Sequence, residues 1–328
     1  MEVLNEVSRA DNLGGSDLPY SQSLTERQTK SWKKILASKL ATIDSESVLS
    51  ARSFWINAMF TANRRLKCGD RSLFLAIAYL DKCIYGDMHM LPLLSPLKRA
   101  FHPLSKTSEY SLAAAVVILR TAACVECDDA PSMIEVGSMF TGRPSKAFFV
   151  AIQRDLLRFL KFSLLVPTAI DFIEAFASWK LHNPSHEIVY RCSIFTALVG
   201  LLGAKVHTKH YPSDIGLASI TTAWETVTKG EALPFYVERT DELTICECAI
   251  RVCLHQKIPD YLQMVHKESI KGPWDILCTI EAVLLNNQAP ASPPTLFPKR
   301  KSPYSIDLPS KREALREYKK RKEVIECN

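Results

Sequence analysis

Glycine is scarce in this chain, with 11 residues among 328, well under the usual share of about 7%. Neither G-x-G-x-x-G nor G-x-x-x-x-G-K-[ST] occurs, so the glycine-rich loops that bind nucleotide phosphates are not expected. No apolar run reaches the length of about eighteen residues that a membrane-spanning helix needs, and we expect no membrane association. The first twenty residues lack an apolar core and include Glu2, Glu6, Asp11 and Asp17, so we expect no signal peptide.

The rest of the composition is that of an ordinary globular protein, with 23% charged and 47% hydrophobic residues. The length corresponds to roughly two folding units of about 150 residues. The ten cysteines are most simply reduced thiols in a cytosolic or nuclear protein. Positive charge gathers at one end: residues 299–328 hold ten basic and five acidic residues, which leaves 31 basic and 30 acidic residues elsewhere. A nearly neutral body predicts no direct binding of nucleic acid.

Apolar residues recur at helical spacing through most of the chain, and no convincing alternation typical of strands occurs. The predicted fold class is therefore all-α. We expect helices at 25–40, 46–63, 72–84, 109–125, 132–140, 146–160, 169–180, 186–203, 212–227, 239–256, 273–286 and 310–326. Asp70 and Ser145 are the expected caps of two of them. Residues 85–108 contain three prolines and predict a loop with at most one short turn.

Both ends of the chain differ in composition from the middle. Residues 1–44 predict a disordered lead followed by one N-terminal helix. Six of the 18 prolines lie from Pro290 to Pro309, which is typical of a linker. Residues 289–328 are therefore expected to form a proline-rich linker and a basic C-terminal tail.

One stretch of the middle carries a recognisable motif. Arg52 lies early in an expected helix, and residues 72–82 read Ser-Leu-Phe-Leu-Ala-Ile-Ala-Tyr-Leu-Asp-Lys. This pattern resembles the start of a cyclin box, whose helix 1 has an early Arg and whose helix 2 has an [ST]-L-x-L-A-x-x-Y-[LI]-D-[RK] run. Residues 156–168, which end in Pro167-Thr168, resemble the end of the first box and the opening of the second.

The resemblance implies a cyclin fold of two stacked five-helix boxes, nearest to the A- and B-type cyclins. The first box would span 45–166 and the second, divergent box 167–288. A weaker match at Tyr211-Pro212-Ser213 is similar to the entry to helix 2 of the second box, and Arg312 to Lys322 are similar to the basic terminal segment of A- and B-type cyclins.

The family resemblance also implies site residues. Arg52 and Asp81 match a structural salt bridge between helix 1 and helix 2. The kinase-binding face would consist of Cys124, Val125, Gln153, Arg154, Leu157, Phe162 and Leu164. The family has a Lys at the position of Cys124 and a Glu at that of Gln153, so both charges are missing, unless a shift of one turn lets Arg120 supply the cation. Simple core packing is the alternative reading of the apolar members.

A substrate-docking groove on helix 1 of many cyclins uses a Met, two aliphatic residues and a Trp. The matching positions here are Ala51, Phe54, Trp55 and Ala58. Because Ala replaces the Trp, we expect this groove to be degenerate or absent.

The cysteine and acidic patterns do not predict a metal, redox or catalytic site. Cys124 and Cys127 form a C-x-x-C pair, but no second pair completes a zinc site, and a redox pair would want a βαβ context. We therefore expect core cysteines at a helix end, no metal and no cofactor. Glu126, Asp128 and Asp129 predict a solvated acidic turn.

The function that the resemblance implies is that of a regulatory cyclin subunit, not an enzyme, that binds and activates a cyclin-dependent protein kinase in cell-cycle control. Kinase substrates or inhibitors are further expected partners. One alternative is a cyclin-fold scaffold that has lost kinase activation, and another is a TFIIB-like transcription module. Lys299, Arg300 and Lys301 resemble a short nuclear import signal, so we expect a nuclear or cytoplasmic protein, or one found in both places.

Overall fold

The computed structural model describes residues 46–86, 91–92, 95–101, 109–142, 144–177, 184–229, 233, 239–255, 258, 262–263, 266 and 270. The regular secondary structure of these residues is helical, and none of them lies in a strand. The predicted all-α fold class is therefore confirmed. All of these residues belong to one compact unit, residues 1–282.

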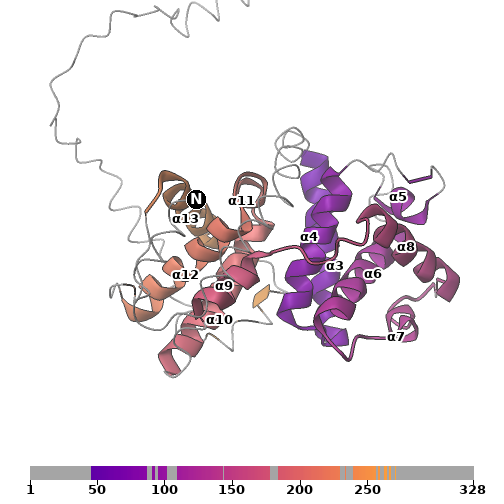
Figure 1. Cartoon of the computed structure of the whole chain (residues 1–328), viewed down its shortest axis with the longest axis horizontal. Coiled ribbons are helices and arrows are strands. Elements are labelled where there is room, and N and C mark those ends of the chain that lie inside the picture. Colours follow the sequence, from indigo (N-terminus) through magenta and orange to yellow (C-terminus); the bar gives the residue numbers. More distant parts are fainter. Residues whose placement is uncertain are drawn as a thin grey trace, which may run out of the picture. The chain divides into compact units, whose positions relative to one another are not determined.

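The first group of helices surrounds α6. The group consists of α3 (Glu46–Leu66), α4 (Gly69–Tyr85), α5 (Pro96–Ala100), α6 (Glu109–Glu126), α7 (Met133–Gly137) and α8 (Lys146–Phe159). Each of the other five contacts α6 (Figure 1). Residues 113–119 of α6 are all buried, as expected for a helix that is apolar all round.

The second group surrounds α12. The group consists of α9 (Ala169–Ala177), α10 (Pro184–Leu202), α11 (Ala204–Lys209), α12 (Pro212–Thr228) and α13 (Asp241–His255). Helix α12 contacts α9, α10 and α13 (Figure 1). Gly216 permits the close crossing with α9, because a Cβ atom there would lie 2.9 Å from the backbone oxygen of Ala169.

The two groups share one apolar core and meet where α4 contacts α9. The chain passes from the first group to the second between Leu160 and Thr168. The expected boundary at 166/167 falls in this segment, while the assignment of the groups to two cyclin boxes stays a prediction.

Most helix boundaries agree with the sequence to within a few residues, and the caps show where they differ. Ser145 caps α8 as predicted, through a bond from the Phe148 amide at 3.2 Å. The predicted cap Asp70 is wrong: α4 begins at Gly69, after Cys68, and Asp70 lies in its first turn. Helix α11 was not predicted, because it follows α10 after Gly203 alone and its six residues show no clear apolar periodicity.

Several predictions lie outside the residues that the structure describes. These are the helices at 25–40, 273–286 and 310–326, the linker, the basic tail and the import signal. Within the part that is described, no helix combines the length and hydropathy that crossing a membrane requires.

Candidate partner-binding site

Arg52 and Asp81 form a buried ion pair between α3 and α4. The Nε atom of Arg52 donates to Oδ1 of Asp81 at 2.7 Å, and Nη2 donates to Oδ2 at 3.3 Å. Nη1 of Arg52 donates to the backbone oxygen of Leu201 at 2.7 Å, in the last turn of α10. Both side chains are 1% exposed. Arg52 therefore joins three helices, where the resemblance implied two.

The residues predicted for the kinase-binding face lie at the end of α6, along α8 and in the turn after α8. Cys124, Arg154 and Phe162 are exposed. The other four are partly buried and are Val125, Gln153, Leu157 and Leu164. None of the seven is fully buried, although Val125 and Leu164 pack against the core, as the alternative interpretation of the apolar members expects.

The turn after α8 has an unusual backbone. Lys161 and Phe162 are consecutive residues with φ of 51° and 57°, a left-handed conformation that is rare for bulky side chains. The Phe162 amide donates to the Leu157 oxygen at 3.0 Å, and the Tyr79 hydroxyl donates to the Leu164 oxygen at 2.5 Å. This arrangement holds the Phe162 side chain 69% exposed.

Exposed apolar residues extend this turn along α8. Val150 and Leu157 are seven residues apart and lie on one face of the helix. Val150 is exposed, and so is Leu165, which follows the turn. We refer to Val150, Leu157, Phe162 and Leu165 as the α8 patch. Val150 and Leu165 are members that the family resemblance did not indicate.

The exposed charges beside the α8 patch are positive. Arg154, Arg158 and Lys161 are all exposed. The one acidic residue of α8, Asp155, is buried and accepts a bond from the Ser95 hydroxyl at 2.6 Å. The exposed residues of α8 are therefore either apolar or basic, even though neither expected family charge is present.

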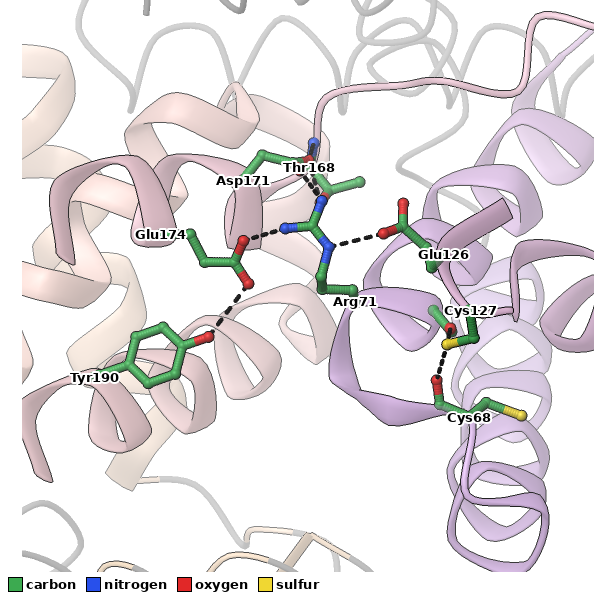
Figure 2. A network of polar contacts seen from close by, with 9 residues as sticks. Cys68, Arg71, Glu126, Cys127, Thr168, Asp171, Glu174 and Tyr190 are labelled. Atoms are coloured by element: carbon green, nitrogen blue, oxygen red, sulfur yellow. Dashed lines mark hydrogen bonds and ion pairs between the residues drawn. The ribbon is translucent and has the colours of Figure 1, made fainter. Parts of the chain in front are cut away.

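A polar network anchored by Arg71 fixes the end of α6 (Figure 2). The guanidinium of Arg71 donates to Glu126 at 2.7 Å, to Asp171 at 3.0 Å and to Glu174. Figure 2 shows the side chain reaching from α4 between α6 on one side and α9 on the other. Burial raises the pKa of Glu174, and the nearby positive charge of Arg71 opposes this shift. The Tyr190 hydroxyl donates a hydrogen bond to Glu174 at 3.2 Å. The network thus joins both helical groups.

The predicted solvated acidic turn is wrong for Glu126. Its side chain is only 17% exposed and is paired with Arg71, whereas Asp128 and Asp129 are exposed as expected. The signal that was missed is Arg71 itself, which stands directly before the Ser72–Lys82 motif.

The docking-groove positions lie on α3 and contribute partly to the core. Trp55 is 3% exposed, and its ring meets Phe101 edge-on at 4.8 Å between centroids. Ala51 is buried, while Phe54 and Ala58 are partly exposed. Phe101 belongs to the 85–108 segment, so part of this segment packs on α3 at the expected groove.

The thiols and imidazoles of the described residues form no metal site. Among the residues that the structure describes, no three potential His, Cys, Asp or Glu ligands lie close enough to hold an ion. His207 instead contacts the Tyr85 hydroxyl at 3.2 Å and the Gly203 oxygen at 2.9 Å. The prediction that the C-x-x-C cysteines are core residues is wrong for Cys124, which is exposed, and Cys127 is partly buried.

Comparison with known proteins gives one kind of match. No protein-family model matches the chain, and neither does any curated protein. Among solved structures, the chain is similar to a viral cyclin from herpesvirus saimiri. The sequence identity is 12% and the TM-score 0.43, and the match covers 72% of this chain and 88% of the viral cyclin.

Two further positions bear on the site. Tyr79, which supports the turn after α8, is fully buried, and burial raises its pKa. Sequence reasoning placed Tyr79 in the motif without assigning it a role. Arg120, which a shifted alignment would bring to the missing Lys position, donates from Nε to the Pro131 oxygen at 3.0 Å.

Proposed function

We propose that this chain is a divergent cyclin that binds a cyclin-dependent protein kinase and activates it as a regulatory subunit. Two observations support the proposal. The resemblance at residues 51–84 has a physical counterpart, because Arg52 and Asp81 are paired between α3 and α4. The residues matched to a kinase-binding face also have exposed or partly exposed side chains.

The exposure of Phe162 is the observation that carries the proposal. A large aromatic side chain in contact with water, on a left-handed backbone, is unfavourable for an isolated protein. Backbone strain of this kind persists where the surrounding structure enforces it, and it clusters at functional sites. Here Leu157 and Tyr79 hold the turn in place. A partner that covers Phe162 would remove the cost of its exposure.

The proposed mechanism requires no chemistry from this chain. The α8 patch would pack against the regulatory helix of the kinase and hold that helix in its active position. Arg154, Arg158 and Lys161 border the patch, which fits a helix with one apolar face and acidic residues beside it. Nuclear import through residues 299–301 and additional binding of substrates or inhibitors belong to the same proposal.

The test is affinity purification of the tagged full chain from its own cells, with identification of partners and a kinase assay on the eluate. We expect a stoichiometric, active kinase with the unmodified chain. The double variant Leu157→Asp and Phe162→Asp should bind about 30-fold more weakly or worse, because buried anchors at interfaces are worth about 2 kcal/mol or more.

Ile134→Asp is the matched control, since Ile134 lies on α7 and is 75% exposed outside the α8 patch. The control should retain the kinase. Equal retention by the double variant would contradict the proposed face.

A cyclin-fold scaffold without kinase activation is the second candidate. The observation that favours it is the absence of the family's charged pair: Cys124 and Gln153 are uncharged, and Arg120 is engaged with Pro131. Charge-assisted bonds of this kind contribute about 1.5–3 kcal/mol each. A folded chain that copurifies with other proteins but with no kinase would establish the scaffold instead.

A further inference from the structure

Three thiols gather around the end of α6. The Sγ atom of Cys127 donates to the backbone oxygen of Cys68 at 3.4 Å and lies 3.6 Å from the Ser72 hydroxyl. Cys124 lies one helical turn before Cys127 and is exposed. Figure 2 shows the Cys127 sulfur directed at the backbone of Cys68, while the Cys68 sulfur points away from it. The reduced thiol of Cys127 thus links α6 to the turn between α3 and α4.

Cys68 is the least suited of the three to react. Its side chain is buried, and burial, together with the neighbouring Cys127 and Cys124, raises its pKa to about 11. Since the thiolate is the reacting form, Cys68 is nearly unreactive at neutral pH. Its contribution to the cluster is the backbone oxygen that Cys127 contacts.

Cys124 and Cys127 have the spacing of side chains on one helical face. The Cys127 amide donates to the Ala123 oxygen at 2.8 Å, so the helical turn continues through Cys127. Side chains three residues apart have Cβ atoms about 5–6 Å apart, and a disulfide needs about 3.5–4.5 Å. The last turn of α6 must therefore tighten slightly, which is easiest at a helix end.

We propose that Cys124 and Cys127 are a thiol modification site that forms a reversible disulfide with a low-molecular-weight disulfide as oxidant. The exposed sulfur of Cys124 attacks one sulfur of the oxidant, forms a mixed disulfide and releases one small thiol. The sulfur of Cys127 then attacks Cys124, releasing the second small thiol and closing the protein disulfide. Two protein thiols are oxidised and one small disulfide is reduced to two thiols.

Closing this disulfide rearranges the end of α6. The Cys127 sulfur leaves the Cys68 oxygen and Ser72, and the turn that tightens contains Glu126, the α6 partner of Arg71. Cys124 and Val125 belong to the proposed kinase-binding face, so oxidation would alter that face. This regulatory consequence rests on the proposed function, whereas the disulfide itself does not.

Trypsin separates Cys68 from Cys124 and Cys127, so the digest shows which thiols are paired. Residues 121–146 form one peptide with Cys124 and Cys127 as its only cysteines, because cleavage does not occur before Pro144, and residues 68–71 form another with Cys68 alone. The purified full chain is equilibrated with mixtures of reduced and oxidised glutathione, free thiols are alkylated, and the digest is analysed without reduction.

The expected result is a 121–146 peptide that has lost two hydrogens and regains them with dithiothreitol. Exposed Cys248 is the matched control. The 121–146 disulfide should form at an oxidised-to-reduced ratio about tenfold lower than modification of Cys248, since a neighbouring thiol makes the second step intramolecular. Separate glutathione adducts on Cys124 and Cys127, or a link between peptides 121–146 and 68–71, would overturn the proposed pair.

Cys124→Ser keeps the reduced contact of Cys127 with Cys68 but cannot form the disulfide. Oxidation should therefore weaken kinase binding by the wild type about tenfold. It should leave kinase binding by Cys124→Ser at the level that this variant shows when reduced. If the wild type binds the kinase equally well before and after oxidation, with the disulfide present, the regulatory consequence is ruled out. Failure of every form to bind a kinase would instead count against the proposed function.

Discussion

At the scale of single residues, the polar side chains that the fold buries have the largest consequences. Arg52 satisfies its guanidinium with one carboxylate and one backbone oxygen, so a single side chain orients α3, α4 and the end of α10. Removing one member of such a pair leaves a buried charge without compensation, which costs more than the pair itself contributes.

Asp81→Asn should lower the free energy of unfolding by about 3–5 kcal/mol, a large share of a total of about 5–15 kcal/mol. The measurement is urea-induced unfolding. Glu187→Gln serves as the control, because it breaks the Arg191–Glu187 pair, in which both side chains are about half exposed. The control should cost at most about 0.5 kcal/mol. Similar losses for both variants would show that burial of Arg52 is not what matters.

His210 gives the protein a predictable response to acid. Burial lowers its pKa below the usual 6.5, with Asp214 opposing the shift and Lys209 supporting it. The unfolded chain takes up a proton near pH 6.5, while the folded chain takes it up only at lower pH. The stability that neutral His210 provides is therefore present above pH 6.5 and is lost as pH falls toward its folded pKa.

The free energy of unfolding should thus decrease below pH 6.5, and His210→Gln should remove up to about 1.4 kcal/mol per pH unit of that slope. Unfolding measured at several pH values between 7 and 5.5 checks this. The pKa of His266 is also lowered by burial, so His266 contributes to the pH dependence with the same sign, and the variant keeps this contribution. An unchanged slope in His210→Gln would contradict the assignment.

At the scale of elements, the sequence predicts the long helices and the short helix α7, but it does not predict helices at α5 and α11. Residues 146–160 showed a clear apolar stripe, and Phe149, Ile152, Leu156 and Leu160 are indeed buried. Helices of five or six residues, such as α5 and α11, are too short to display a period. Their positions depend on contacts made elsewhere, such as Ser95 of the α5 cap with Asp155 of α8.

The sequence likewise predicts only part of the candidate site. The motif at Arg52 and residues 72–82 indicated the Arg52–Asp81 pair, because the family that it resembles has a salt bridge between these two positions. Sequence alone did not indicate Arg71 as a junction, since its partners Glu126, Asp171 and Glu174 lie 55 to 103 residues away. Nor could it indicate the left-handed turn at Phe162, because Lys161 and Phe162 are not turn-favouring residues.

At the scale of the whole described unit, the two helical groups share an apolar core, and Arg71 adds polar contacts between them. The guanidinium faces three carboxylates that come from α6 and α9. Without it, three negative charges would repel one another between the two helical groups. The side chain is 41% exposed, so solvent screens part of this effect.

Arg71→Met should lower the free energy of unfolding by about 1–3 kcal/mol, and added salt should reduce the deficit by screening the remaining carboxylates. Hydrogen exchange should quicken at the end of α6 and in α9 more than in α13. Arg65→Met is the control, as Arg65 is an exposed residue of α3. A deficit that is independent of salt would mean that Arg71 acts through packing of its stem.

The last residues of α6 also limit how this chain can change during evolution. Cys124 contacts solvent, Glu126 faces Arg71, and Cys127 reaches the backbone of Cys68. Because each residue of a helix is turned about 100° from the one before, these directions depend on the number of residues that precede them. Substitutions inside α6 can be compensated by their neighbours. An insertion or deletion would rotate all three directions at once, so the length of α6 should vary less among descendants than its sequence.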